Sequence, residues 1–276
     1  MMKIGMVLSC WMDRLTEQLA LYREAGFDGV EVRMTEEGQR VAGALRVDRV
    51  EEDARELAEA AAAAGIEVHS IMCSPLWRYP LTSPDESVRR MGLRIVERAL
   101  AAAEVLGATA VLVVPGLVTE EVGYEEAINR ARESIGELLA HAEDRGVILA
   151  VENVGNRLLL SPLEMRGFVD SFNSDYVRAY FDVGNVLLLR QGYPQDWIRI
   201  LGRRIAKVHM KDYDSRTGGV TYLLQGDVNW LEVMRALREI GYDDYLTAEL
   251  PPYRLFPEKM LRDTASALRL LTSAAP

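Results

Sequence analysis

The chain has 276 residues, of which 49% are hydrophobic and 27% are charged, and this is the composition of a globular protein with a sizeable core. The 32 Lys and Arg against 42 Asp and Glu give a formal net charge of −10, which argues against binding to nucleic acid or to an anionic membrane surface. Two cysteines cannot form a disulfide framework, so we expect a reducing, cytoplasmic environment. The N-terminus lacks the apolar run of a signal peptide, and no stretch approaches the roughly 18 apolar residues of a membrane span.

From the N-terminus onward, short β-branched runs alternate with longer stretches rich in Ala, Glu, Arg and Leu. This alternation is typical of βα units with a parallel sheet. The runs predict eight strands, over residues 4–9, 29–33, 67–72, 110–114, 147–152, 177–182, 205–210 and 245–249.

The clearest helical stretches lie between these strands, at residues 50–64, 84–106, 124–145, 230–240 and 257–271. A glycine follows several of the predicted helices and precedes the next strand, as expected of a left-handed helix C-cap. These glycines are Gly26, Gly65, Gly107, Gly146 and Gly241.

Eight repeats of strand and helix predict an α/β protein, a single (β/α)8 barrel domain over residues 1–276. The competing fold is a doubly wound open sheet, which normally carries a glycine-rich phosphate motif after its first strand. Here the first strand is followed by LSCWMDR, which contains no such motif.

The last four predicted strands each end at or next to a side chain that can bind a metal, namely Glu152, Asp182, His209 and Glu249. A single acid or histidine at a strand end is often only a solvated terminus or a structural residue. In a barrel, however, the carboxyl ends of the strands share one face, so these four side chains converge. Three carboxylates and one imidazole favour one divalent metal ion, Mn²⁺ or Co²⁺, with Mg²⁺ or Zn²⁺ possible.

Several segments resemble a known family: GVILAVEN, YFDVGNVLL, IAKVHMKDYD, LLQGDVNWLEVMRALREIGYDDYLTAEL and AGFDGVEV. The sequence is similar over essentially its whole length to the xylose-isomerase-like TIM barrel superfamily, which includes sugar isomerases, ketose 3-epimerases, inosose dehydratases and endonuclease IV. The DVGN and HMKD segments resemble the sugar phosphate isomerase/epimerase branch. The resemblance implies that the same four residues bind one divalent metal, and that the chain forms a homodimer or homotetramer.

The resemblance also implies a reaction, the isomerisation or epimerisation of a small sugar or sugar phosphate. A metal-stabilised enediolate would form when one catalytic glutamate removes a proton, and Glu152 and Glu249 would exchange protons with it. Two alternatives remain open. One is a metal-dependent dehydratase of an inosose or dehydroshikimate-like ketone, and the other is a non-catalytic sugar-binding barrel.

The sequence departs from the ketose 3-epimerases that act on free sugars. These carry a histidine where this chain has Asn185, and a second glutamate in a loop that here, over residues 154–160, contains no acid. We therefore expect a phosphorylated substrate or a different polyol. Endonuclease IV uses many histidines, whereas this chain has three.

Further residues near the predicted strand ends are candidates for contact with the substrate. Lys211 shares a strand face with His209 and could bind an oxyanion, and the loop over residues 74–84 could act as a lid. Glu31 could instead pair with Arg33, and His69 could be an ordinary buried histidine. The predicted substrate-binding residues are Asn185, Lys211, His69, Glu31, Arg216 and Trp11.

Overall fold

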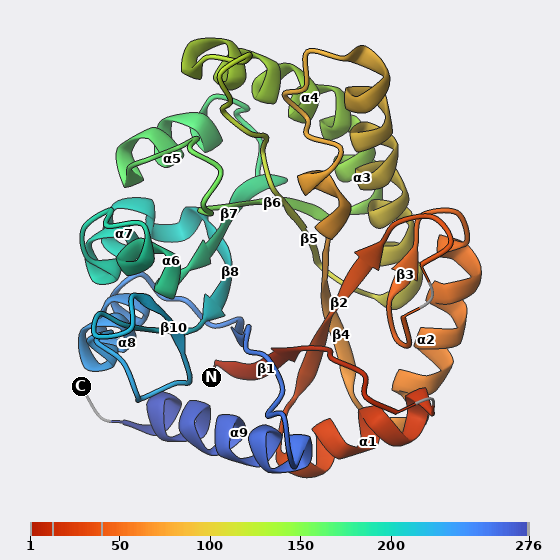
Figure 1. Ribbon diagram of the computed structural model, residues 1–276, viewed down its shortest axis with the longest axis vertical. Helices are drawn as coiled ribbons and strands as arrows, with labels where there is room; N and C mark the ends of the chain where they lie inside the picture. The colour runs from red at the N-terminus through yellow and green to blue at the C-terminus, as the bar shows by residue number, and fades with distance from the viewer. Residues whose placement is uncertain (1, 13, 40, 275–276) are drawn as a thin grey trace.

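The computed structural model, which describes residues 2–12, 14–39 and 41–274, forms a closed ring of parallel strands surrounded by helices (Figure 1). Around the ring the strands follow the order β1-β11-β8-β7-β6-β5-β4-β2, and pairing of β1 with β2 closes it. The predicted (β/α)8 barrel is therefore confirmed. The barrel strands are β1 (Lys3–Val7), β2 (Gly29–Thr35), β4 (Glu67–Met72), β5 (Ala110–Val113), β6 (Ile148–Glu152), β7 (Val177–Asp182), β8 (Ile205–Met210) and β11 (Tyr245–Ala248).

The strands alternate between an inner and an outer hydrophobic core. In β5, Ala110 and Leu112 join a small cluster with Tyr180 of β7, whereas Val111 and Val113 join the large cluster that includes the helices. This period of two is the pleat of a β-strand. It places side chains two residues apart on the same face, and it therefore directs selected strand-end residues into the mouth of the barrel.

The helices cover the outside of the ring (Figure 1). All five glycines predicted to follow helix ends, Gly26, Gly65, Gly107, Gly146 and Gly241, adopt the left-handed conformation with φ between 64° and 104°. The helices are α1 (Leu15–Ala25), α2 (Val50–Ala64), α3 (Glu86–Leu106), α4 (Tyr124–Arg145), α5 (Pro162–Asp170), α6 (Val183–Leu188), α7 (Pro194–Leu201), α8 (Trp230–Glu239) and α9 (Pro257–Ser273), with 3₁₀ turns η1 (Ser74–Trp77) and η2 (Gly202–Arg204).

The structure differs from the predicted elements mainly at the barrel mouth. β2 continues two residues beyond the predicted end at Arg33, because Met34 and Thr35 pair with the short strand β3 (Leu45–Arg46). A hairpin of β9 (Asp212–Asp214) and β10 (Gly219–Thr221) follows β8. The predicted lid, residues 74–84, is anchored rather than free, since Leu76 and Leu81 are fully buried.

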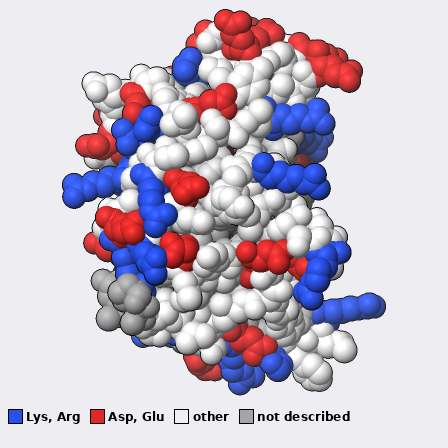
Figure 2. All heavy atoms as spheres, turned by 90° about the vertical axis from the view of Figure 1, so that its left-hand side faces the viewer, with Lys and Arg blue, Asp and Glu red and all other residues white. Residues whose placement is uncertain are grey.

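The outer surface carries mixed charge. On the side formed by α5, α7 and α8, acidic and basic side chains are interspersed (Figure 2). Some of them form ion pairs, such as Arg199 with Glu239 at 2.7 Å. Within the described residues, no helix has the length and apolar character needed to cross a bilayer.

Candidate metal centre

Four side chains with metal-binding atoms meet at the carboxyl ends of four neighbouring barrel strands. Glu152 ends β6, Asp182 ends β7, His209 lies in β8 and Glu249 follows β11. One ligand atom from each lies within 4.8 Å of the others. Ligands about 2.1 Å from an octahedral cation lie about 3 to 4.2 Å apart, so this cradle has the size that a small divalent cation requires.

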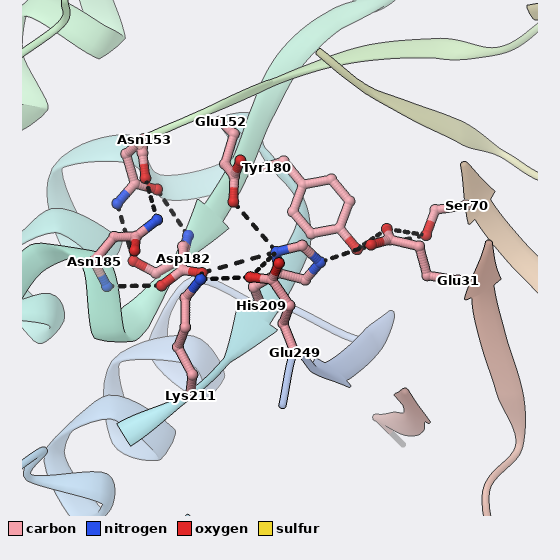
Figure 3. A network of polar contacts seen from close by, with 10 residues as sticks. All are labelled: Glu31, Ser70, Glu152, Asn153, Tyr180, Asp182, Asn185, His209, Lys211 and Glu249. Atoms are coloured by element: carbon pink, nitrogen blue, oxygen red, sulfur yellow. Dashed lines mark hydrogen bonds and ion pairs between the residues drawn. The ribbon is translucent and has the colours of Figure 1, made fainter. Parts of the chain in front are cut away.

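The His209 ring is oriented like that of a metal-bound histidine (Figure 3). Its Nδ1 lies 3.3 Å from Glu152 Oε1, 3.8 Å from Asp182 Oδ2 and 3.7 Å from Glu249 Oε2. Its Nε2 lies 2.8 Å from Glu31 Oε1. Histidines that bind metals donate their second ring N–H to a carboxylate in this way, which leaves the other nitrogen free for the cation.

Glu31 lies on the side of the His209 ring away from the other carboxylates. It is fully buried within β2, and its Oε2 accepts hydrogen bonds of 2.6 Å from the Tyr180 hydroxyl and the Ser70 hydroxyl. Among the described residues Glu31 forms no ion pair with Arg33; it lies deep in the barrel and supports His209 instead. Its role as a substrate contact stays a prediction.

Asp182 is held by two asparagines. Its backbone N–H donates to Asn153 Oδ1 at 2.7 Å, and its Oδ1 accepts from the Asn185 backbone N–H at 2.7 Å as the N-cap of α6. Its Oδ2 is buried and lacks a well-aligned hydrogen bond, so it is directed to the cradle as a ligand would be. Asn185 is buried and donates its side-chain N–H to the Asn153 carbonyl, so it shapes the Asp182 turn, and its predicted contact with the substrate stays a prediction.

Lys211 reaches the cradle from the residue after β8. Its Nζ lies 2.8 Å from Asp182 Oδ2 and forms an ion pair with Glu249. Lys211 thus reaches the same cluster as His209, as their shared strand face predicts, while its binding of a substrate oxyanion stays a prediction. The neighbouring Asp212 does not orient this lysine; its carboxylate instead accepts from four donors, the backbone N–H groups of Tyr213, Gly226 and Val228 and the indole of Trp230.

The pKa values of the two glutamates in the cradle are shifted in opposite directions. Burial raises the pKa of Glu152 to about 7 against the opposing effect of His209. Burial also acts on Glu249, but the charges of His209 and Lys211 outweigh it and lower the pKa of that carboxyl. For His209 itself, burial favours the neutral ring, yet Glu31 and Glu152 hold its pKa well above the usual range. One glutamate is thus biased toward the protonated form and the other toward the ionised form.

The structure does not bring His69 or Arg216 into this cluster. His69 is buried in the barrel, where it contacts the Ser70 and Thr247 hydroxyls and stacks on Tyr245 with ring centroids 4.0 Å apart. Arg216 lies in the β9–β10 hairpin, and its guanidinium is bound to Asp214 by two contacts of 2.9 Å. Both were predicted substrate contacts. In the structure the His69 side chain contacts other residues inside the barrel, and the Arg216 side chain contacts Asp214 in the hairpin.

Trp11, in the loop after β1, has a buried indole N–H without a partner among the described residues. Its role as a substrate contact stays a prediction. Sequence reasoning missed Tyr180, Ser70 and Asn153. Two of these carried a usable signal, since Tyr180 precedes Asp182 by two residues on one strand face and Asn153 directly follows Glu152.

Comparison with known proteins agrees with this geometry. The model of the xylose isomerase-like TIM barrel family matches residues 19–271. The chain belongs to this family. A curated relative, the L-ribulose-5-phosphate 3-epimerase UlaE of Escherichia coli strain Crooks, is 30% identical over 237 residues, which cover 84% of this chain and 79% of the relative. UlaE of Salmonella heidelberg is 28% identical over 233 residues, with the same coverage.

Solved structures share the fold at lower identity. An L-ribulose 3-epimerase superposes with a TM-score of 0.80 at 20% identity, covering 99% of this chain and 95% of the other. The 3-keto-D-glucoside 4-epimerase YcjR of Escherichia coli gives a TM-score of 0.79 at 18% identity, covering 98% and 99%. The family, with its named epimerases, makes this chain an enzyme rather than a non-catalytic barrel.

Proposed function

We propose that this enzyme is a divalent-cation-dependent epimerase that inverts the carbon next to the carbonyl of a small ketose or ketose phosphate. The observation that carries the proposal is the pair of glutamates that approach His209 Nδ1 from two different strands (Figure 3). Glu152 arrives from β6 and Glu249 from the end of β11, and their protonation preferences are opposite. The curated relatives named as L-ribulose-5-phosphate 3-epimerases support the same reaction class.

The cation would be held by Glu152, Asp182, His209 and Glu249, whose mixed oxygen and nitrogen donors favour Mn²⁺ or Co²⁺ over a purely oxygen-loving ion. When bound, a divalent cation would polarise the substrate carbonyl and offset the negative charge that develops as the neighbouring carbon loses its proton. The structural features that fit this role are Asp182 Oδ2 and His209 Nδ1, which both face the cradle, and the contact of His209 Nε2 with Glu31, which leaves Nδ1 as the nitrogen that would bind the cation.

The two glutamates then divide the proton transfers. Glu249, the carboxylate that Lys211 contacts, removes the proton from the carbon next to the carbonyl. Glu152, which reaches the cradle from β6, delivers a proton to the same carbon from the opposite side. One C–H bond breaks on one face and another forms on the other face, which inverts the centre. In the reverse reaction the two residues exchange roles.

A dehydratase would share the first proton abstraction and then expel a hydroxyl group. An aldose–ketose isomerase would return the proton to the neighbouring carbon. The products therefore separate these reactions, and the epimerase names of the relatives favour epimerisation.

The test is to incubate the Mn²⁺-loaded enzyme with L-ribulose 5-phosphate in D₂O and to follow the products by NMR. We expect the C3 epimer, with deuterium at C3 of both sugars. An aldose labelled at C2 would indicate isomerisation, and an unsaturated or dicarbonyl product would indicate dehydration. Absence of exchange on both L-ribulose 5-phosphate and L-ribulose would contradict the proposal. Glu67→Gln, at the opposite end of the barrel, serves as the control that keeps full activity.

A further inference from the structure

Arg33 is a cation at the barrel mouth without a counter-ion among the described residues. It lies in β2 two residues after Glu31, so it shares a strand face with Glu31 one step nearer the carboxyl end. Its Nε is buried and has no hydrogen-bond partner. Two other arginines near the mouth are paired, Arg78 with Glu36 and Arg216 with Asp214. Because a buried donor without an acceptor costs about 1–3 kcal/mol, this one calls for a ligand.

The Arg33 side chain lines a hollow of about 450 Å³ at the carboxyl ends of β1, β2 and β4. Hydroxyl and amide groups from Ser9, Thr35, Gln39 and Ser74 share the lining. Its acidic residue, Glu36, is already paired with Arg78. The hollow therefore combines these polar groups with an apolar wall, and its charge without a counter-ion among the described residues is positive.

Two more buried N–H donors lie in the same sector of the barrel. The Trp11 indole and the Gln18 side-chain amide have no acceptor among the described residues. They are joined to each other, since the Trp11 backbone N–H donates to Gln18 Oε1 at 3.3 Å, and the Trp11 ring stacks on Tyr22. A sector that gathers unpartnered donors suits a ligand rich in acceptor oxygens.

The hollow lies next to the strand that leads to the catalytic carboxylate. In the ring of strands, β1 lies between β2, which carries Arg33, and β11, which is followed by Glu249. Arg33 and Glu249 therefore come from the same end of the barrel, on the two strands that flank β1. A substrate that reacts at Glu249 can therefore extend across β1 toward Arg33.

We infer that Arg33 binds the phosphate group of a ketose phosphate whose carbonyl end lies at Glu249. This inference rests on the proposed function. A guanidinium matches phosphate oxygens through two parallel N–H···O contacts, and the neutral polar lining supplies further donors. The Arg33 side chain thereby selects phosphorylated over free ketoses.

The first test does not depend on catalysis. Inorganic phosphate is titrated by calorimetry into the Mn²⁺-loaded wild type and into Arg33→Met, Arg33→Lys and Arg216→Met. We expect Arg33→Met to weaken phosphate binding by about 10- to 100-fold, Arg33→Lys to retain part of it, and Arg216→Met to match the wild type. Equal phosphate affinity in wild type and Arg33→Met, or no phosphate binding by the wild type, overturns the inference.

The second test compares L-ribulose 5-phosphate with L-ribulose. We expect Arg33→Met to lower kcat/KM for the phosphate ester by about 10- to 100-fold and to change kcat/KM for L-ribulose by less than about threefold. Equal losses on both sugars overturn the inference. If neither sugar is turned over by the wild type, the proposed function fails, and the phosphate titration still decides the role of Arg33.

Discussion

Replacing Glu31 with glutamine removes the charge behind His209 while keeping the size of the side chain. Glutamine keeps only one acceptor oxygen. It can therefore accept from the Tyr180 and Ser70 hydroxyls, now bonded to Oε2 at 2.6 Å, or from His209 Nε2, now 2.8 Å from Oε1, but not from both. Loss of such a supporting carboxylate commonly costs 10–100-fold in metal affinity, which is about 1.4–2.7 kcal/mol. We therefore expect the Kd for Mn²⁺ to rise by about that factor.

The assay is a calorimetric titration of Mn²⁺ at pH 7.5 in two buffers of different ionisation enthalpy, which also counts the protons released. Glu31 holds the pKa of His209 above its usual range, so binding of Mn²⁺ to the wild type should release a proton from the ring. Glu31→Gln should release fewer protons as well as bind more weakly. Tyr180→Phe, which removes only one of the bonds to Glu31, should show a smaller loss. Unchanged affinity and proton release in Glu31→Gln would refute a positioning role.

Four further predictions address catalysis and stability. Glu152→Gln and Glu249→Gln should each lower kcat by at least about 100-fold with unchanged circular dichroism, and near-normal turnover in either would exclude the two-base scheme. Asp212→Ala should lower the free energy of unfolding in urea by about 2–4 kcal/mol, because four buried donors lose their acceptor; a loss below about 1 kcal/mol would show that water replaces it. Arg46 outweighs burial and lowers the pKa of Asp53, so this ion pair stabilises the fold above the ordinary Asp pKa and loses that effect as pH falls from the ordinary pKa through the lowered one. The destabilisation caused by Asp53→Asn should thus be larger at pH 7 than well below the ordinary Asp pKa, near about pH 2–3, and a pH-independent difference would contradict this sign. Saturating Mn²⁺ should raise the Tm of the wild type, and it should not raise that of Asp182→Ala.

The barrel could be predicted because its signals are local and repeated. Gly26, Gly65, Gly107 and Gly146 mark helix ends through their own left-handed backbone, with no help from distant residues. The cradle was predictable for the same reason, since closure of the ring brings together the carboxyl ends of β6, β7, β8 and β11.

The surroundings of the cradle could not be predicted, because they depend on contacts between residues far apart in the chain. Glu31 and His209 are separated by 178 positions in the chain. Their contact depends on how β2 pairs within the barrel, where its register with β4 shifts between Val30 and Glu31. Asn185 has the residue type of a substrate contact, yet the turn after β7 uses it to brace Asp182. Arg33 was considered only as a partner for Glu31, because nothing in the sequence reveals that Tyr180, Ser70 and His209 occupy that carboxylate instead.

The most direct test of this account is the metal stoichiometry of the wild type and of the Asp182→Ala variant, measured by Mn²⁺ titration with a parallel urea unfolding curve. The account predicts about one tightly bound ion per wild-type chain and at least about a 100-fold loss of affinity in the folded variant. A wild type that binds no divalent ion, or a variant that binds it as tightly as the wild type, would contradict the assignment of these four side chains as one metal centre.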